Sequence, residues 1–215
     1  MKIIYKFLVL VLIYILIENL TQYILQTDKL FYSFLSEQYS INQIEKILNF
    51  QKKWEWLYYI FIPIFLLIKI ILVSSVLYIG TFFYSKIKIT FKQLFEVVIM
   101  AEFIFLLIGV SKIIWFHFFQ KIYTLEDLQY FYPLSALNIV GYKGLEQYFT
   151  YPFQVLNLFE LSYILFLAYH IGELTYNTKE KSKPMDFGLK IVASSYIPAL
   201  LLWVALVMFF TLNNT

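Results

Sequence analysis

Five long apolar stretches constrain the fold of this chain more than any other feature. An α-helix rises 1.5 Å per residue, so about 20 residues cross the roughly 30 Å of hydrocarbon in a bilayer. Within hydrocarbon, backbone polar groups must find partners inside their own segment, which a helix provides. The sequence therefore predicts an all-α fold, a polytopic transmembrane bundle of five helices that forms one domain over residues 1–215. The predicted spans lie near residues 3–25, 56–83, 94–118, 153–174 and 188–212.

Composition agrees with lipid as the main solvent. Hydrophobic residues make up 61% of the 215 residues and charged residues only 14%, against about 45–50% and about 25% in soluble domains. A soluble fold of this length could not bury so much apolar surface. The lipid bilayer is therefore the first expected partner.

Several classes of function are disfavoured by what the sequence lacks. The net charge of +3 is scattered and there is no Arg, so no nucleic-acid partner is expected. The absence of Cys excludes thiolate catalysis and Cys-ligated metal sites. No phosphate-binding glycine loop, serine-nucleophile elbow or paired-carboxylate motif occurs. We expect no catalytic residues, no enzymatic activity and no cofactor.

Lysines in the short connections predict the orientation in the membrane, because cytoplasmic loops carry an excess of positive charge. The connections 84–93 and 175–187 hold six lysines and few acids, whereas the other two connections are nearly balanced. Lys2 and Lys6 add positive charge at the N-terminus. The first span is long and no small-residue cleavage site follows it, so it is expected to be retained. We expect a membrane protein with a cytoplasmic N-terminus and an external C-terminus.

The external connections are predicted to contain short interfacial helices near 40–52 and 124–132. Ser40 and Gln43 have the spacing of a capping box, and apolar residues recur behind them at helical intervals. Thr124 to Asp127 opens the second helix, which is expected to end near Pro133. The apolar segment 134–140 is too short to span and is interpreted as interfacial or re-entrant.

Two charges lie deep in the predicted spans. Lys69 is at the midpoint of the second span, and Glu102 lies about 12 Å from the cytoplasmic start of the third. A long Lys side chain can reach several ångströms along a helix, so the two could meet. Such a pair could form a proton or ion relay, or it could be an ion pair that holds neighbouring helices together.

A second cluster of polar residues is expected nearer the external side. Three spans contribute to it, and each member falls in the outer third of its predicted helix. Its function could be to line a solute cavity or to join helices by hydrogen bonds. The members are Glu18, Asn19, Lys112, Asn157 and Glu160.

His170 and Glu173 share one helical face at the spacing i, i+3 near the cytoplasmic end. Glu-x-x-His motifs bind metals in helical bundles, but here the order is reversed and no second copy occurs. The other histidine, His117, belongs to the opposite membrane face. No metal site is therefore expected.

Three stretches give the chain a resemblance to a known family. They are Ile79-Gly80 with Ile89–Phe95, then Tyr132–Asn138 in the external connection, and Tyr151–Glu160 at the start of the fourth predicted span. Over about two-thirds of its length the chain resembles the bacterial branch of the Yip domain family, small five-span membrane proteins named for Rab-type GTPase interaction in eukaryotes. The resemblance implies a non-enzymatic membrane protein of the bacterial inner membrane and assigns no site residue.

The sequence thus favours a scaffold, or a subunit of a membrane assembly, whose partner is another membrane protein or further copies of this chain. The alternative is a small-solute or ion transporter or channel that uses the buried Lys, Glu and Asn positions. Five spans without an internal repeat differ from the inverted repeats of many secondary transporters. A membrane-embedded enzyme is a third alternative, for which no catalytic set is recognised.

Overall fold

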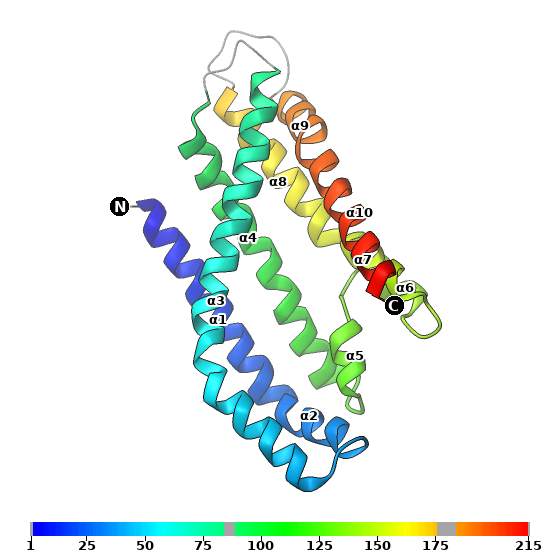
Figure 1. Ribbon diagram of the computed structural model, residues 1–215. Helices are drawn as coiled ribbons and strands as arrows, with labels where there is room; N and C mark the ends of the chain where they lie inside the picture. Colours follow the sequence, from blue (N-terminus) through cyan, green and yellow to red (C-terminus); the bar gives the residue numbers. More distant parts are fainter. Residues whose placement is uncertain (1, 84–88, 176–183, 215) are drawn as a thin grey trace.

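The computed structural model describes residues 2–83, 89–175 and 184–214, and within these ranges every regular element is a helix. Figure 1 shows a tall bundle in which α3 runs nearly the whole height of the molecule. The elements in chain order are α1 (Lys2–Leu25), α2 (Thr27–Ser36), α3 (Ile41–Phe82), α4 (Phe91–Ile114), the π-helical turn η1 (Trp115–Phe119), α5 (Leu125–Tyr130), α6 (Ala136–Val140), α7 (Gln147–Val155), α8 (Leu158–Thr175), α9 (Pro184–Ser194) and α10 (Tyr196–Asn214).

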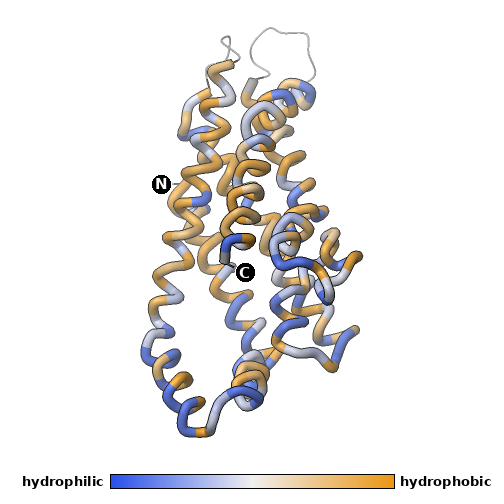
Figure 2. Tube along the Cα trace, turned by 45° about the vertical axis from the view of Figure 1, so that its right-hand side comes forward, coloured by the Kyte–Doolittle hydropathy of each residue, from blue (hydrophilic) through white to orange (hydrophobic). Residues whose placement is uncertain are grey.

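Four helical stretches are long and apolar enough to cross a membrane. They are α1, α3, α4 continued by η1, and α9 continued by α10. Orange apolar residues cover most of these helices in Figure 2, and blue polar residues gather mainly at the ends and in the connections. This arrangement is compatible with a multi-pass membrane protein. The region near 153–174, predicted as a further span, contains α8 but is not one of these four stretches.

The predicted interfacial helix near 40–52 is not a separate element. It forms the first turns of α3, which continues without a break into the apolar stretch and has a length of about 63 Å at the usual rise per residue. The expected boundary followed the change in hydropathy, but no Gly or Pro between residues 41 and 62 stops the helix. The capping box is present, because Gln43 Oε1 accepts from the Ser40 amide at 3.0 Å.

The predicted span near 153–174 is interrupted. Helix α7 ends at Val155, and the chain leaves the helical conformation at Leu156 and Asn157 before α8 begins. At this break the Ala136 amide donates to the Leu156 carbonyl at 2.8 Å, and the Leu158 amide donates to the Leu134 carbonyl at 3.1 Å. The short apolar segment before α6 thus supplies partners for the backbone groups that the break exposes.

Two further features of the fold differ from the predictions. Helix α2 follows Gln26, whose φ of 50° turns the chain sharply after α1; the sequence analysis did not predict this helix. The last predicted span has a break at Ser195 between α9 and α10, close to Pro198, which has no amide hydrogen to donate.

Helix α5 lies inside the predicted helix 124–132, and its Thr124–Asp127 capping box is present.

The main core lies where α1, α3, α4, α8 and α9 meet. Leu10, Ile70, Leu94, Leu167 and Ile191 are among its fully buried side chains. The end of α3, the start of α4, the end of α8 and the start of α9 lie together at one end of the molecule (Figure 1).

Candidate functional site

The candidate site is centred on the ion pair between Lys69 of α3 and Glu102 of α4. Lys69 Nζ lies 2.8 Å from Glu102 Oε2, and the Tyr163 hydroxyl of α8 donates to Glu102 Oε1 at 3.1 Å. Both oxygens of a carboxylate that is fully buried therefore have a partner. Lys69 and Glu102, which the sequence places within reach of each other, are in contact, and Tyr163 extends the contact to a third helix.

Aromatic rings also surround the Lys69 ammonium group. It lies 4.0 Å from the centroid of the Phe105 ring and 5.7 Å from that of Tyr163. Ring faces attract a cation, and the attraction is stronger where water is excluded. The Lys69 side chain nevertheless remains 43% exposed, so its charge is partnered on one side and accessible on the other.

A second carboxylate lies close to this pair. Glu160 Oε1 of α8 accepts from the Tyr196 hydroxyl of α10 at 2.6 Å, and the rings of Tyr163 and Tyr196 are 5.5 Å apart. The positive charge of Lys69 also attracts the Glu160 carboxylate. Asn157 begins α8 as its N-cap, since its Oδ1 accepts from the Glu160 amide at 2.7 Å. Two acids and one lysine thus share the centre of the bundle.

The other members of the predicted outer group lie in a different set of contacts. Glu18 of α1 lies close to Tyr58 of α3, and its charge also reaches Lys112 of α4. The neighbouring Asn19 accepts from the Tyr59 hydroxyl at 3.0 Å. The contacts therefore divide the five predicted residues into two groups.

The break before α8 explains this division. Because α8 begins only at Leu158, Asn157 caps the helix and Glu160 lies in its first turn. There Glu160 contacts Tyr196 and lies near the charge of Lys69, while Lys112 lies near the charge of Glu18. The predicted span near 153–174 was treated as one uninterrupted helix, so the depth it gave for Asn157 and Glu160 did not place them in this arrangement.

His170 and Glu173 form a pair on the surface of α8. His170 Nδ1 lies 3.1 Å from Glu173 Oε2, and both side chains are partly exposed. Within the described ranges, no group of three His, Cys, Asp or Glu side chains is arranged to hold a metal ion.

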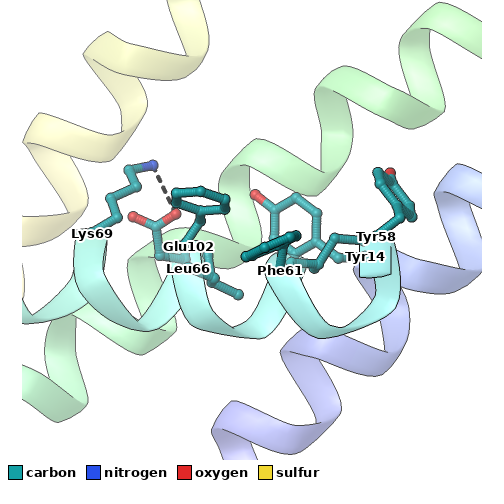
Figure 3. Close-up of a pocket in the computed structure, with 8 residues that line it drawn as sticks. Tyr14, Tyr58, Phe61, Leu66, Lys69 and Glu102 are labelled. Atoms are coloured by element: carbon teal, nitrogen blue, oxygen red, sulfur yellow. Dashed lines mark hydrogen bonds and ion pairs between the residues drawn. The ribbon is translucent and has the colours of Figure 1, made fainter. Parts of the chain in front are cut away.

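A groove of about 460 Å³ leads from the surface to the central ion pair. Its walls come from α1, α3 and α4 and are almost entirely apolar. In Figure 3 the Tyr14 ring lies along this groove with its hydroxyl toward the end formed by Lys69 and Glu102, and Tyr58 marks the other end. The lining residues are Tyr14, Tyr58, Phe61, Ile62, Phe65, Leu66, Lys69 and Glu102.

The sequence analysis missed the tyrosines. Tyr14, Tyr58, Tyr163 and Tyr196 either partner the carboxylates or line the groove. A buried carboxylate needs donors, and tyrosine is an apolar residue that supplies one. With 19 tyrosines in the chain, no local spacing indicated which of them would contact a carboxylate, because Tyr163 bonds Glu102 and Tyr196 bonds Glu160 from other helices.

The fold and site define the chain as an all-helical protein compatible with several membrane crossings, with charged groups paired between its helices. Comparison with known protein families, curated proteins and solved structures finds no match.

Proposed function

We propose that this chain is a non-enzymatic inner-membrane scaffold, or a subunit of a membrane assembly, similar to the bacterial Yip domain proteins. The observation that carries the proposal is the pairing of the central charges. Lys69, Glu102 and Tyr163 join three helices, and Glu160 and Tyr196 add a fourth. Of the described buried side-chain polar atoms, Ser74 Oγ alone lacks a hydrogen-bond partner. Satisfied polar contacts between helices stabilise a bundle in lipid.

The proposal includes five spans: the four long apolar stretches and α8, which is the fourth crossing in chain order. Helix α8 has 18 residues. At the usual rise per residue its length is about 27 Å, close to the hydrocarbon thickness. Lys6 of α1 forms an ion pair with Glu96 of α4 at 2.6 Å, which supports placing the N-terminus beside the start of α4.

The lysine-rich connections then share the cytoplasmic side with the N-terminus, and the C-terminus is external. A reporter fused to each terminus tests this orientation and the number of spans together. We expect the two reporters on opposite sides of the membrane, and reporters on the same side contradict five spans.

Cross-linking in intact membranes tests the scaffold role. Because the chain has no Cys, a single cysteine placed at exposed Phe209 is a unique attachment point for a photo-activated cross-linker. We expect adducts with one membrane protein or with a second copy of the chain. A cross-linked product containing only lipid, together with a monomer in mild detergent, contradicts the proposal.

A transporter is the second candidate, because the groove brings an accessible surface to Lys69 and Glu102. The rate of proton leak can be measured directly in liposomes that contain the protein and a pH-sensitive dye. The scaffold proposal predicts the same proton leak as in empty liposomes, and unchanged leak with Lys69→Met. A leak that the intact protein raises and Lys69→Met abolishes establishes transport instead.

A further inference from the structure

The groove between α1, α3 and α4 combines an apolar channel with hydrogen-bond donors at its inner end. Lys69 carries three N–H donors, of which Glu102 takes one. The Tyr14 hydroxyl lies toward the same end (Figure 3) and has no hydrogen-bond partner among the described residues. Two donors from different helices therefore converge beside the ion pair, and a ligand acceptor could satisfy both.

The charges at this end select the kind of acceptor. Lys69 pairs with Glu102, and its charge also attracts the Glu160 carboxylate. One positive charge therefore lies near two negative charges. A ligand that brought another negative charge would be repelled by the excess acid. A neutral acceptor such as a carbonyl group has no such penalty and accepts from Lys69 and Tyr14.

The position of the donors along α3 narrows the ligand further. Within this helix Lys69 is thirteen residues from both Trp56 and Phe82. That separation is about 20 Å each way, so Lys69 lies near the middle of the apolar stretch. The ester carbonyls of bilayer phospholipids remain near the interface and do not reach this depth. A lipid that dissolves wholly in the hydrocarbon can bring its carbonyl head there.

The walls of the groove fit a flat head and a long tail. Tyr14, Phe61 and Phe65 are aromatic, and planar rings pack well in offset or edge-to-face arrangements. The lining residues of α3 run from Tyr58 to Lys69, a distance of about 16 Å along the helix at the usual rise. The volume of the groove is about 460 Å³. A space of that size lies within the range of small-molecule sites.

We infer that this groove binds a neutral membrane-soluble quinone, whose ring carbonyl accepts from Lys69 and Tyr14 and whose tail follows α3 toward Tyr58. The inference depends on the membrane placement of α3 and not on the scaffold role. Failure of quinone binding therefore leaves that role untouched, and a monomeric protein can still bind quinone.

The test uses the full chain in phosphatidylcholine nanodiscs, with a decyl-tailed benzoquinone as the probe and quenching of tryptophan fluorescence as the readout. We expect saturable quenching. Tyr14→Phe removes one donor without changing shape, so it should weaken binding about fivefold. Tyr5→Phe is the matched control, because Tyr5 is an exposed tyrosine on the same helix, and it should leave the affinity unchanged.

Two further arms exclude other occupants. Ile62→Trp fills the groove and should abolish saturation, whereas Leu72→Trp, on the exposed face of α3, should not. Decanoic acid should fail to displace the quinone, and decylbenzene, which lacks carbonyls, should displace it much more weakly than the quinone displaces itself.

Any of three results in the nanodisc binding assay would overturn the inference. They are displacement by decanoic acid, equal binding of decylbenzene, and the same affinity in Tyr14→Phe and Tyr5→Phe. Organic extraction of the protein purified from its own membrane should recover a quinone, and recovery of phospholipid alone contradicts the inference.

Discussion

The bundle packs tightly on one side and leaves a groove on the other. Between α8 and α9 the backbones nearly touch: a Cβ added to Gly188 would overlap the Ala168 carbonyl group, and one added to Gly172 would overlap that of Pro184. Between α1 and α3, by contrast, Tyr14, Phe61 and other bulky residues line an open groove.

The two sides differ in residue size, which would decide the packing of a bundle placed in lipid as proposed. The hydrophobic effect does not drive helices together there, so close packing must hold them. Small residues permit that packing between α8 and α9. Large aromatic residues keep α1 and α3 apart and leave space for a ligand or a lipid chain.

The largest expected effect comes from adding one methyl group to the tightly packed side. The methyl group of Gly188→Ala meets backbone that cannot yield easily, so this change should destabilise the protein by about 3 kcal/mol. Thermal unfolding in detergent measures the change. Gly109→Ala is the matched control, because the atoms its methyl group meets all belong to the Ile17 side chain and none to the backbone of another helix. It should cost about 1 kcal/mol or less, and equal losses in the two variants would break the comparison.

Truncation of a large side chain should also cost more stability on the tightly packed side than at the groove. Ile171→Ala, at a fully buried position of α8, removes packing contacts and should cost about 2 kcal/mol. Phe65→Ala, at the groove, starts from a side chain that is 65% exposed and should cost less than about 0.5 kcal/mol. Denaturation by a strong detergent titrated into a mild one measures both. A larger loss for Phe65→Ala would mean that the groove is closed in the folded protein.

The smallest expected effect lies outside both regions, at the start of α5. Asp127 accepts from the Thr124 amide at 2.9 Å and from the Tyr142 hydroxyl at 2.7 Å. The bond from the Thr124 amide, in particular, lowers the pKa of Asp127 below its usual range. Burial, followed by the hydrogen bond to Asp127, raises the pKa of Tyr142 to about 12.

A carboxyl whose pKa is lowered on folding stabilises the protein above its unfolded pKa, and that contribution is lost as the pH falls through the folded value. Amide hydrogen exchange should therefore show α5 less protected at acidic than at neutral pH, after correction for intrinsic exchange. Asp127→Ala should reduce protection at neutral pH and remove this pH dependence, while Glu126→Ala should retain it. The same pH dependence in Asp127→Ala would assign it to another group.

Much of the helical architecture follows from hydropathy, because long apolar stretches must be helical in lipid. Breaks and continuity within helices were harder to predict. The break at Leu156 and Asn157 depends on hydrogen bonds to residues 134–136, which no local pattern reveals. The continuity of α3 through residue 52 was missed because a change in hydropathy is not a helix end.

The central ion pair was predictable because two isolated charges in apolar helices need partners. Counting residues placed Lys69 and Glu102 within reach of each other, as they are in the structure. The tyrosines were not predictable in the same way. Their roles depend on which helices are neighbours, and α8 brings Tyr163 to Glu102 and Glu160 to Tyr196 only in the folded bundle.

We propose that the ion pair between Lys69 and Glu102 holds the helices together. A double-mutant cycle of Lys69→Met, Glu102→Met and the double variant, with unfolding measured in bilayers or mild detergent, tests it most directly. Lys69→Met alone leaves the fully buried Glu102 without its cation. That variant should cost about 3 kcal/mol, whereas the double variant should recover much of the loss. We predict a favourable coupling energy of at least about 1 kcal/mol between the two side chains. Losses that simply add, with no coupling, would contradict the account.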